Sequence, residues 1–235
     1  MNPILVGVAF AVTAGAVTAV SAREDRAALV GLVVALAAAP FLADPLPSLS
    51  TLATRVIGAA LAAYLIRVAV APTPVEPETR RREVGPGGSP LGWPAEALLA
   101  IAAWIVGLTV STHLLALAPG GPTVSPDDIL GALGVSSLAT GSGLAIIVIG
   151  IVPALGSRHA VRTAVGLLIL VQGLTLVRAG VAEEPSDLEE LAGVALLIVA
   201  AIVGSVLITI ERRTPDEAHR DPGGGPRPDQ QAGSE

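Results

Sequence analysis

The sequence predicts an all-α membrane protein with seven transmembrane helices, an external N-terminus and a cytoplasmic C-terminus. Three observations lead to this fold class. Hydrophobic residues make up 52% of the 235 positions and charged residues only 14%, whereas soluble domains usually carry about 25% charged residues. Apolar stretches close to the ~20 residues that cross a bilayer recur along the whole chain. Arginines gather after every second stretch, which is typical of cytoplasmic loops.

Seven apolar stretches are separated by turn-forming and charged segments. They cover residues 3–21, 27–43, 51–71, 96–116, 129–155, 160–179 and 189–210. The breaks between them are REDR, ADPLPS, PTPVEPETRRREVGPGGSP, APGGPTVSPDD, GSRH and AEEPSD, which are rich in Pro, Gly and charge. Each stretch is expected to be helical, because lipid offers no hydrogen-bond partner to free backbone groups.

The charges alternate between the two sides of the predicted bundle. The arginines at or after the ends of the first, third, fifth and seventh stretches are Arg23, Arg26, Arg67, Arg80, Arg81, Arg82, Arg158, Arg162, Arg212, Arg213, Arg220 and Arg227. The opposite loops carry the acidic residues Asp44, Asp127, Asp128, Glu183, Glu184, Asp187, Glu189 and Glu190. Because basic loops stay in the cytoplasm, this alternation predicts the orientation. It also supports seven crossings, since one helix more or less would break the pattern. The chain is expected in the cell (plasma) membrane as a multi-pass protein.

The breaks divide the chain into five parts. An N-terminal unit of three helices covers residues 1–72, a cytoplasmic linker 73–95, and a fourth helix with its outer loop 96–128. A second unit of three helices covers 129–212, and a charged, Pro- and Gly-rich tail, expected to be disordered, covers 213–235. The small residues before Ala22 also resemble a signal-peptide cleavage site. However, no basic residue precedes the apolar core, and cleavage would leave Arg23 and Arg26 outside.

Two polar side chains inside the spans are candidates for a polar path or a subunit contact, because lipid makes such groups costly unless they have a partner or a task. Arg55 lies about one turn from the outer end of the third stretch. It either snorkels to the outer headgroups or faces a neighbouring subunit or polar path. Gln172 lies about 15 Å along the helix from Arg162 and about 9 Å from Arg178. It either forms an interhelical hydrogen bond or orients water in an ion pathway.

Two histidines also lie near the ends of the spans, and one of them, His113, is a third candidate for the polar path or a subunit contact. His113 lies toward the outer end of the fourth stretch, where it either titrates near neutral pH or serves as a structural hydrogen-bonding group. His159 lies between arginines at the predicted cytoplasmic mouth and is expected to be solvated.

The fifth stretch is rich in small residues. They are Gly134, Ser136, Ser137, Ala139, Thr140, Gly141, Ser142 and Gly143. Such residues permit close approach of helices, so the pattern favours a helix packed among others over a pore lined by hydroxyl groups. Pro153 is expected to kink or end this helix.

The sequence offers no residues for catalysis, cofactor binding or metal binding. The absence of cysteine excludes disulfides, Fe–S clusters and thiolate metal sites. No Asp or Glu falls at mid-span, with Glu96, Glu189 and Glu190 at span edges, and no nucleotide-binding, metalloprotease, hydrolase or haem-ligating motif is present. A role in nucleic-acid binding is not expected either. The chain is therefore not predicted to be an enzyme on its own.

The last third contains GLAIIVIGIVPALGSRHAVRTAVGLLILVQG followed by LAGVALLIVAAIVGSVLITIERR. This order resembles the K subunit of proton-pumping NADH dehydrogenases and the C subunit of multisubunit Na⁺/H⁺ antiporters. The pair Gly166-Leu167 matches the family's Gly-Leu pair, and Gln172 falls at its amide position. The family's two glutamates would fall at Leu168 and near Val199, so the resemblance does not carry a proton-handling role.

The whole chain, over roughly residues 1–213, resembles component E of hydrogenase-4 and formate-hydrogenlyase-type complexes. That family has three helices, a cytoplasmic linker, a fourth helix and a K-like triplet, and Thr54-Arg55 match a threonine and basic residue in its third helix. The acidic residue of the family's helix six is missing here, where Val171 precedes Gln172.

The resemblance implies a non-catalytic membrane subunit of an ion-translocating complex, without a cofactor of its own, packed against a larger antiporter-like subunit. Two alternatives remain at the level of sequence. The chain is a structural membrane protein unrelated to ion pumping, or it is a small independent transporter, which would be expected to show an internal repeat.

Overall fold

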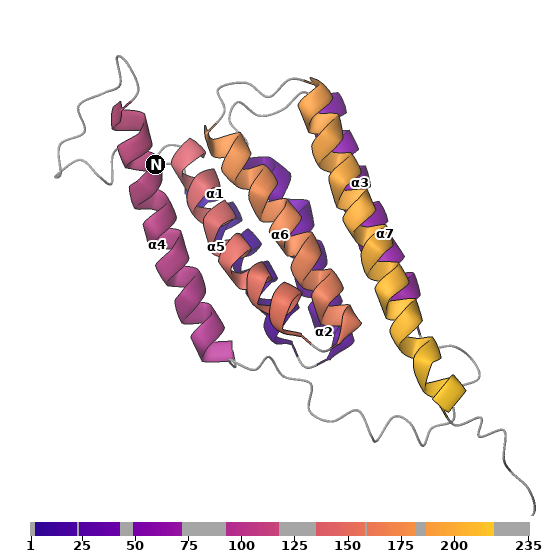
Figure 1. Cartoon of the computed structure of the whole chain (residues 1–235). Coiled ribbons are helices and arrows are strands. Elements are labelled where there is room, and N and C mark those ends of the chain that lie inside the picture. The colour runs from indigo at the N-terminus through magenta and orange to yellow at the C-terminus, as the bar shows by residue number, and fades with distance from the viewer. Residues whose placement is uncertain are drawn as a thin grey trace, which may run out of the picture.

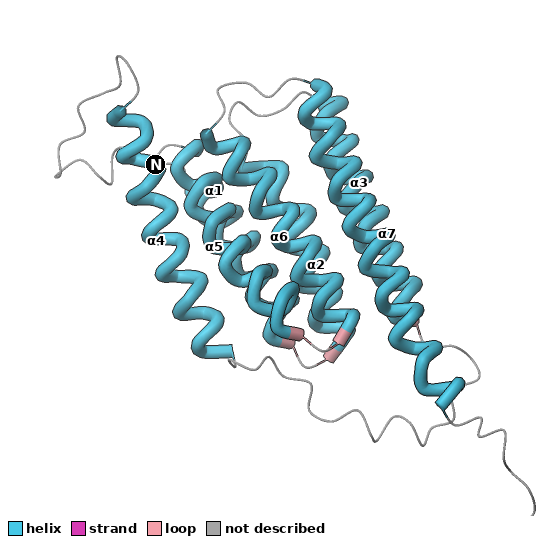
Figure 2. Tube along the Cα trace, in the orientation of Figure 1, coloured by secondary structure: helices cyan, strands magenta, loops and turns pink. Residues whose placement is uncertain are grey.

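The computed structural model describes residues 3–22, 24–42, 49–71, 93–117, 135–157, 159–181 and 187–218, and every element in these ranges is a helix. The elements are α1 Pro3–Ser21, α2 Asp25–Ala38, the short 3₁₀ helix η1 Ala39–Leu42, α3 Leu49–Val70, α4 Trp93–Leu117, α5 Val135–Gly156, α6 Ala160–Val181 and α7 Asp187–Ala218. Figure 2 shows helices joined by short loops where the chain is described. The prediction of an all-α fold is confirmed.

The seven α-helices lie side by side and alternate in direction, as the predicted crossings require (Figure 1). Helices α5 and α6 form the centre, α1 and α2 pack together beside them, and α3 packs along α7. Helix α4 stands at one edge of the bundle against α5, while α3 and α7 form the opposite edge (Figure 1). The central helices α5 and α6 are therefore covered by the α1–α2 pair, the α3–α7 pair and the single helix α4.

The predicted spans match helices that are long and apolar enough to cross a membrane. Six described segments meet this condition by length and composition, and α4 contributes a shorter apolar segment over Pro94–Val110. Large hydrophobic side chains point outward from the edge helices, for example Leu61 on α3, Ile105 on α4 and Ile202 on α7. These features are consistent with a multi-pass membrane protein, since lipid can cover such a surface.

Two helix ends differ from the predicted spans. Helix α7 continues to Ala218 rather than ending near residue 210, because polarity alone does not end a helix and Glu and Arg are good helix formers. Helix α5 runs through Pro153 to Gly156, so the proline does not end the helix at its own position. Residues 129–134 of the predicted fifth span, the linker 73–92 and the tail from residue 219 lie outside the described residues.

Glycines placed every seven residues bring α5 and α6 into backbone contact. Gly166 faces Gly150, and a Cβ on Gly166 would lie 2.8 Å from the Gly150 carbonyl oxygen. Gly173 faces Gly143 in the same way, and a Cβ there would also lie 2.8 Å from a carbonyl oxygen. Real Cβ atoms essentially never approach a backbone atom this closely. The heptad spacing keeps the glycines on one seam of two antiparallel helices.

The fifth stretch is packed in the core, as its small residues predict. Ser137, Thr140 and Ser142 are fully or almost fully buried. Trp104 of α4 donates a hydrogen bond from its indole N–H to Ser142 Oγ at 3.3 Å, and Thr140 Oγ1 donates to the Ser136 carbonyl. These hydroxyl groups are used in packing between helices rather than in lining a pore.

Candidate functional site

Polar side chains gather at the two ends of the bundle, and α7 contributes to both. We call one the acidic end, where α7 begins and α6 finishes, and the other the arginine end, where α7, α3 and α5 finish and α6 begins. At each end, two consecutive residues of α7 hold two different neighbouring helices. They are Glu189 and Glu190 at the acidic end and Glu211 and Arg212 at the arginine end.

At the acidic end, Arg55 of α3 forms an ion pair with Glu190 of α7. The guanidinium Nη2 lies 2.7 Å from Glu190 Oε1, although the two residues are 135 positions apart. The side chains are only 21% and 12% exposed, so the pair is largely removed from solvent. Arg55 therefore does not stand alone as a snorkelling residue, because it has a partner within the chain.

The neighbouring residue Glu189 reaches the other adjacent helix. It forms an ion pair with Arg178 in the last turn of α6, and both side chains are nearly half exposed. Adjacent positions on a helix point about 100° apart, so two consecutive glutamates can face two different neighbours. The beginning of α7 is thus held to both α3 and α6 by opposite charges.

These ion pairs line a cavity of about 230 Å³ between α3, α6 and α7, to which α2 and η1 also contribute wall residues. Its polar lining residues include Arg55, Gln172, Arg178, Glu189 and Glu190. The structure therefore brings together Arg55 and Gln172, the two candidates that the sequence singled out on separate helices. The Gln172 side chain is partly buried, and its backbone carbonyl accepts a hydrogen bond from Thr175 Oγ1 at 2.7 Å.

One oxygen in this cluster has no hydrogen bond to the residues that the structure describes. It is Glu190 Oε2, which is buried, while Oε1 of the same carboxylate is held by Arg55. A buried acceptor without a donor costs about 1–3 kcal/mol. The acidic end therefore contains an acceptor on Glu190 that a further hydrogen-bond donor would stabilise.

The third sequence candidate cannot be placed in this site. His113 lies within α4, in the part of that helix whose side chains are outside the described residues. Glu96, by contrast, is described and is only 2% exposed in the first turn of α4. The sequence placed it at a span edge, and its burial there comes from tertiary packing that the sequence pattern does not contain.

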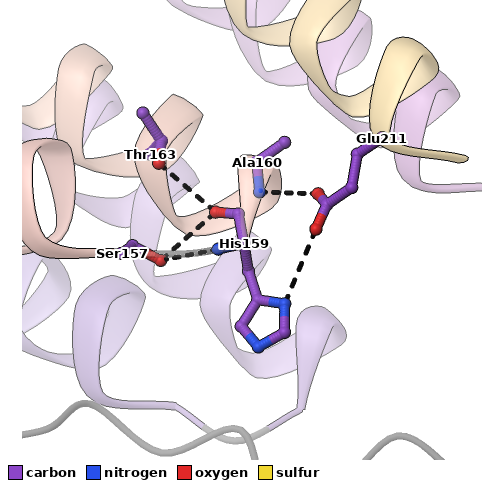
Figure 3. Close-up of polar contacts among 5 residues, drawn as sticks. All are labelled: Ser157, His159, Ala160, Thr163 and Glu211. Carbon is purple, nitrogen blue, oxygen red and sulfur yellow. Dashed lines mark hydrogen bonds and ion pairs between the residues drawn. The ribbon is translucent and has the colours of Figure 1, made fainter. Parts of the chain in front are cut away.

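At the arginine end, Glu211 of α7 caps the beginning of α6 (Figure 3). Its Oε2 accepts a hydrogen bond from the Ala160 backbone N–H at 2.6 Å, and its Oε1 lies 3.6 Å from His159 Nδ1. The turn is tightened by Ser157 Oγ, which lies 3.2 Å from both the backbone N and the carbonyl oxygen of His159. His159 is 64% exposed, as expected for a solvated residue, yet it also lies beside a carboxylate.

The next residue, Arg212, holds the end of α3. Its guanidinium donates to the Ala71 carbonyl at 2.9 Å and to the Val70 carbonyl at 2.8 Å. These are carbonyls at a helix C-terminus, which lack partners within the helix. Arg162 of α6 likewise donates to the Ala22 carbonyl beyond α1, at 3.5 Å. The arginine end is therefore joined mainly through backbone groups.

The distance between the two ends matches a bilayer. Glu190 and Glu211 are 21 positions apart on one helix, which corresponds to about 31 Å at 1.5 Å per residue. The hydrocarbon core of a typical bilayer is about 30 Å thick. The charged residues of α7 thus lie at the two levels where a spanning helix meets headgroups.

The site can fix charges and orient polar molecules. Among the residues that the structure describes, no three His, Cys, Asp or Glu side chains gather where they could hold a metal ion. Sequence reasoning missed Glu189 and Glu190 as site residues because it assigned them to an outer loop edge. The available signal was charge balance, since Arg55 and Arg178 were expected at the same outer end as these two glutamates.

Comparisons of the chain with family models, with curated proteins and with solved structures find no match.

Proposed function

We propose that the chain is a non-catalytic integral membrane subunit of an ion-translocating complex of the membrane-hydrogenase, complex-I or antiporter type. The observation that carries the proposal is the cavity at the acidic end, which Arg55, Gln172 and Glu190 line together inside a mainly apolar bundle. Buried charges in membrane helices usually mark pathways or partner contacts, because they are costly in lipid.

The cavity supplies only part of a path across the membrane. Its lining residues come from the parts of α2, η1, α3, α6 and α7 nearest the acidic end, and Gln172 lies about 9 Å along the helix from Arg178. Gln172 can both donate and accept hydrogen bonds, so it can orient water at the inner limit of the cavity. A complete path then needs polar groups from another subunit, which favours an accessory role over independent transport.

The predicted partner is a larger antiporter-like membrane subunit in the same plasma membrane. The sequence resemblance to hydrogenase-4 component E and to K-type subunits supports this assignment, as does the arginine alternation, which places the N-terminus outside and the C-terminus in the cytoplasm. Redox centres, where such a complex has them, would belong to other subunits, and this chain would hold no cofactor.

Purification in mild detergent followed by mass spectrometry tests the partnership. The tagged chain should co-purify in stoichiometric amount with antiporter-like or hydrogenase-like membrane subunits. The isolated chain in liposomes should move neither H⁺ nor Na⁺, because no carboxylate lies at mid-membrane. Ion flux by the pure chain that a point mutation abolishes would instead establish an independent transporter.

Turnover-linked pH change in vesicles tests the role of the cavity. Gln172→Leu should allow assembly, since an interhelical hydrogen bond contributes only about 0.6–2 kcal/mol, yet it should lower ion translocation per turnover. Thr209→Val, which changes an exposed hydroxyl near the arginine end, is the matched control and should leave coupling unchanged. Wild-type coupling in Gln172→Leu would remove the cavity from the mechanism and favour a structural role.

A further inference from the structure

The cavity at the acidic end is amphipathic and continuous with the membrane-facing surface. One part of its wall carries the four charged side chains, and the rest is mainly apolar, with Gln172 and Thr175 as its polar members. Two of the apolar wall residues, Leu174 of α6 and Leu196 of α7, are 53% and 46% exposed on the outside of the bundle. A molecule lying along these leucines would therefore contact lipid on one side and the charged wall at its end.

The charged wall is electroneutral but dipolar. It contains two arginines, Arg55 and Arg178, and two glutamates, Glu189 and Glu190. An anionic or a cationic ligand would leave one net charge in a partly buried site, which is unfavourable. A ligand that carries one positive and one negative group leaves none, so the wall is complementary to a zwitterion.

The wall also contains a hydrogen-bond acceptor that lacks a donor. Arg55 pairs with Glu190 Oε1, and among the described residues Glu190 Oε2 is buried without a hydrogen-bond partner. A small rotation of this carboxylate would present Oε2 to a donor in the cavity. A primary ammonium group provides three N–H donors, whereas a trimethylammonium group provides none.

The position of the cavity along the bundle axis indicates that such a ligand comes from the membrane. Glu190 lies about 31 Å along α7 from Glu211, so the charged wall lies where headgroups meet the ~30 Å hydrocarbon core. We propose that this cavity binds a membrane phospholipid with a zwitterionic headgroup and a primary ammonium, of the phosphatidylethanolamine type. Its phosphate accepts hydrogen bonds from Arg178, its ammonium donates to Glu189 and Glu190, and one acyl chain lies along Leu174 and Leu196.

Native mass spectrometry of the purified full chain tests this site. The protein is reconstituted in vesicles with equal phosphatidylethanolamine, phosphatidylcholine and phosphatidylglycerol, extracted in mild detergent, and analysed for retained lipid. The ethanolamine lipid should be retained at least about threefold over each of the others. Equal retention, or preference for the anionic lipid, would overturn the proposal.

Substitutions in the charged wall test whether the lipid preference arises at this cavity. Arg178→Gln changes a half-exposed residue and should bring the lipid ratio close to one, and Glu189→Gln provides a second test if the first variant fails to fold. Glu211→Gln, at the other end of α7, should keep the wild-type ratio. A preference that survives both Arg178→Gln and Glu189→Gln would place the lipid elsewhere and overturn the site.

Soluble phosphoethanolamine distinguishes the headgroup from the whole lipid. It should not displace the retained lipid at millimolar concentration, because it lacks the acyl contact with the leucines. Displacement by the soluble compound would show a small-molecule site instead and overturn the lipid assignment. The experiment uses the chain alone, so its outcome is independent of whether the chain belongs to an ion-translocating complex.

Discussion

The two ends of α7 are held to the same two helices, α3 and α6, by different chemical groups. At each end, two consecutive residues hold α6 and α3. At the acidic end both contacts join side chains, Glu189 to Arg178 and Glu190 to Arg55, and they surround a cavity. At the arginine end the main contacts join side chains to backbone groups at helix ends, with Glu211 on the Ala160 N–H and Arg212 on the carbonyls at the end of α3.

This difference indicates which end is structural and which is available for function. Backbone groups at helix termini need partners in any fold, and capping them is a general stabilising device. A partly buried pair of charged side chains costs desolvation energy and is not required to close the bundle. An uncharged helix contact would hold α3 to α7 equally well, so the charges beside the cavity favour a task such as binding or ion handling.

The largest expected effect comes from breaking the central seam on which both ends depend. Gly166→Leu would place a Cβ 2.8 Å from the Gly150 carbonyl oxygen, and backbone cannot give way as a side chain can. We expect a loss of about 3 kcal/mol or more, seen as aggregation or as a failure to elute as a single species in mild detergent. Gly7→Leu is the matched control, since nothing lies within 4 Å of a Cβ there. Equal behaviour of the two variants would contradict the close seam.

The second-largest loss of stability is expected at the acidic end, where it depends on how deeply each ion pair is buried. Arg55→Ala leaves the Glu190 carboxylate without its cation, and at 12% exposure we expect a loss of about 2–3 kcal/mol, somewhat below that for fully buried pairs. Arg178→Ala removes a half-exposed arginine from the neighbouring pair and should cost less than about 1 kcal/mol. Thermal unfolding in detergent measures both. A similar loss for the two variants would mean that the pairs are equally solvated.

The double variant Arg55→Gln with Glu190→Gln separates charge from contact. Two amides can keep a hydrogen bond while removing both charges. The stability lost in Arg55→Ala should largely return, because no buried charge is left without a partner. Lipid retention or ion coupling should nevertheless stay impaired if the charges act in function. Full recovery of both properties would show that this ion pair serves packing alone.

The sequence predicts the helices well and their pairing poorly. Hydropathy places spans because ~20 apolar residues can satisfy their backbone in lipid only as a helix, and the arginine pattern gives an alternating course that the structure follows. Arg55 and Gln172 were identified because polar residues are costly in apolar runs. Their meeting in one cavity was not predictable, since α3 and α6 each have several faces and hydropathy does not specify which one a neighbour covers.

The pairing of α5 with α6 is an exception, because it is accompanied by a periodic pattern of glycines in the sequence. Gly143 and Gly150 repeat at seven residues, as do Gly166 and Gly173, and antiparallel helices with this repeat can align glycine with glycine. The Arg55–Glu190 pair has no such trace, because a single contact between residues 135 positions apart produces no periodicity. A helix contact that repeats every seven residues can be recognised in a single sequence, whereas an isolated ion pair is recognised only once the fold is known.

A moderate effect is expected at the arginine end from Arg212→Ala. The variant removes two hydrogen bonds from an exposed guanidinium to the carbonyls of Val70 and Ala71, and water can replace part of them. We expect a loss of about 1 kcal/mol in thermal unfolding, together with faster amide exchange in the last turn of α3. Unchanged exchange in that turn would mean that Arg212 does not hold the helix end.

The smallest loss of stability is expected for substitutions of Glu211, which distinguish its hydrogen bond to Ala160 from its charge interactions. Glu211→Gln keeps an amide oxygen that can accept from the Ala160 N–H, but it removes the charge opposite His159 and the attraction to the positive end of the α6 dipole. Because the side chain is 42% exposed, we expect a loss of only about 0.5 kcal/mol, decreasing further with added salt. Glu211→Ala removes the same charge and also leaves the backbone N–H to water, so it should cost about 1 kcal/mol, of which the part due to the lost hydrogen bond should persist at high salt. If both variants lose the same stability and show the same salt dependence, the contact at the arginine end depends on charge, and the distinction from the acidic end fails.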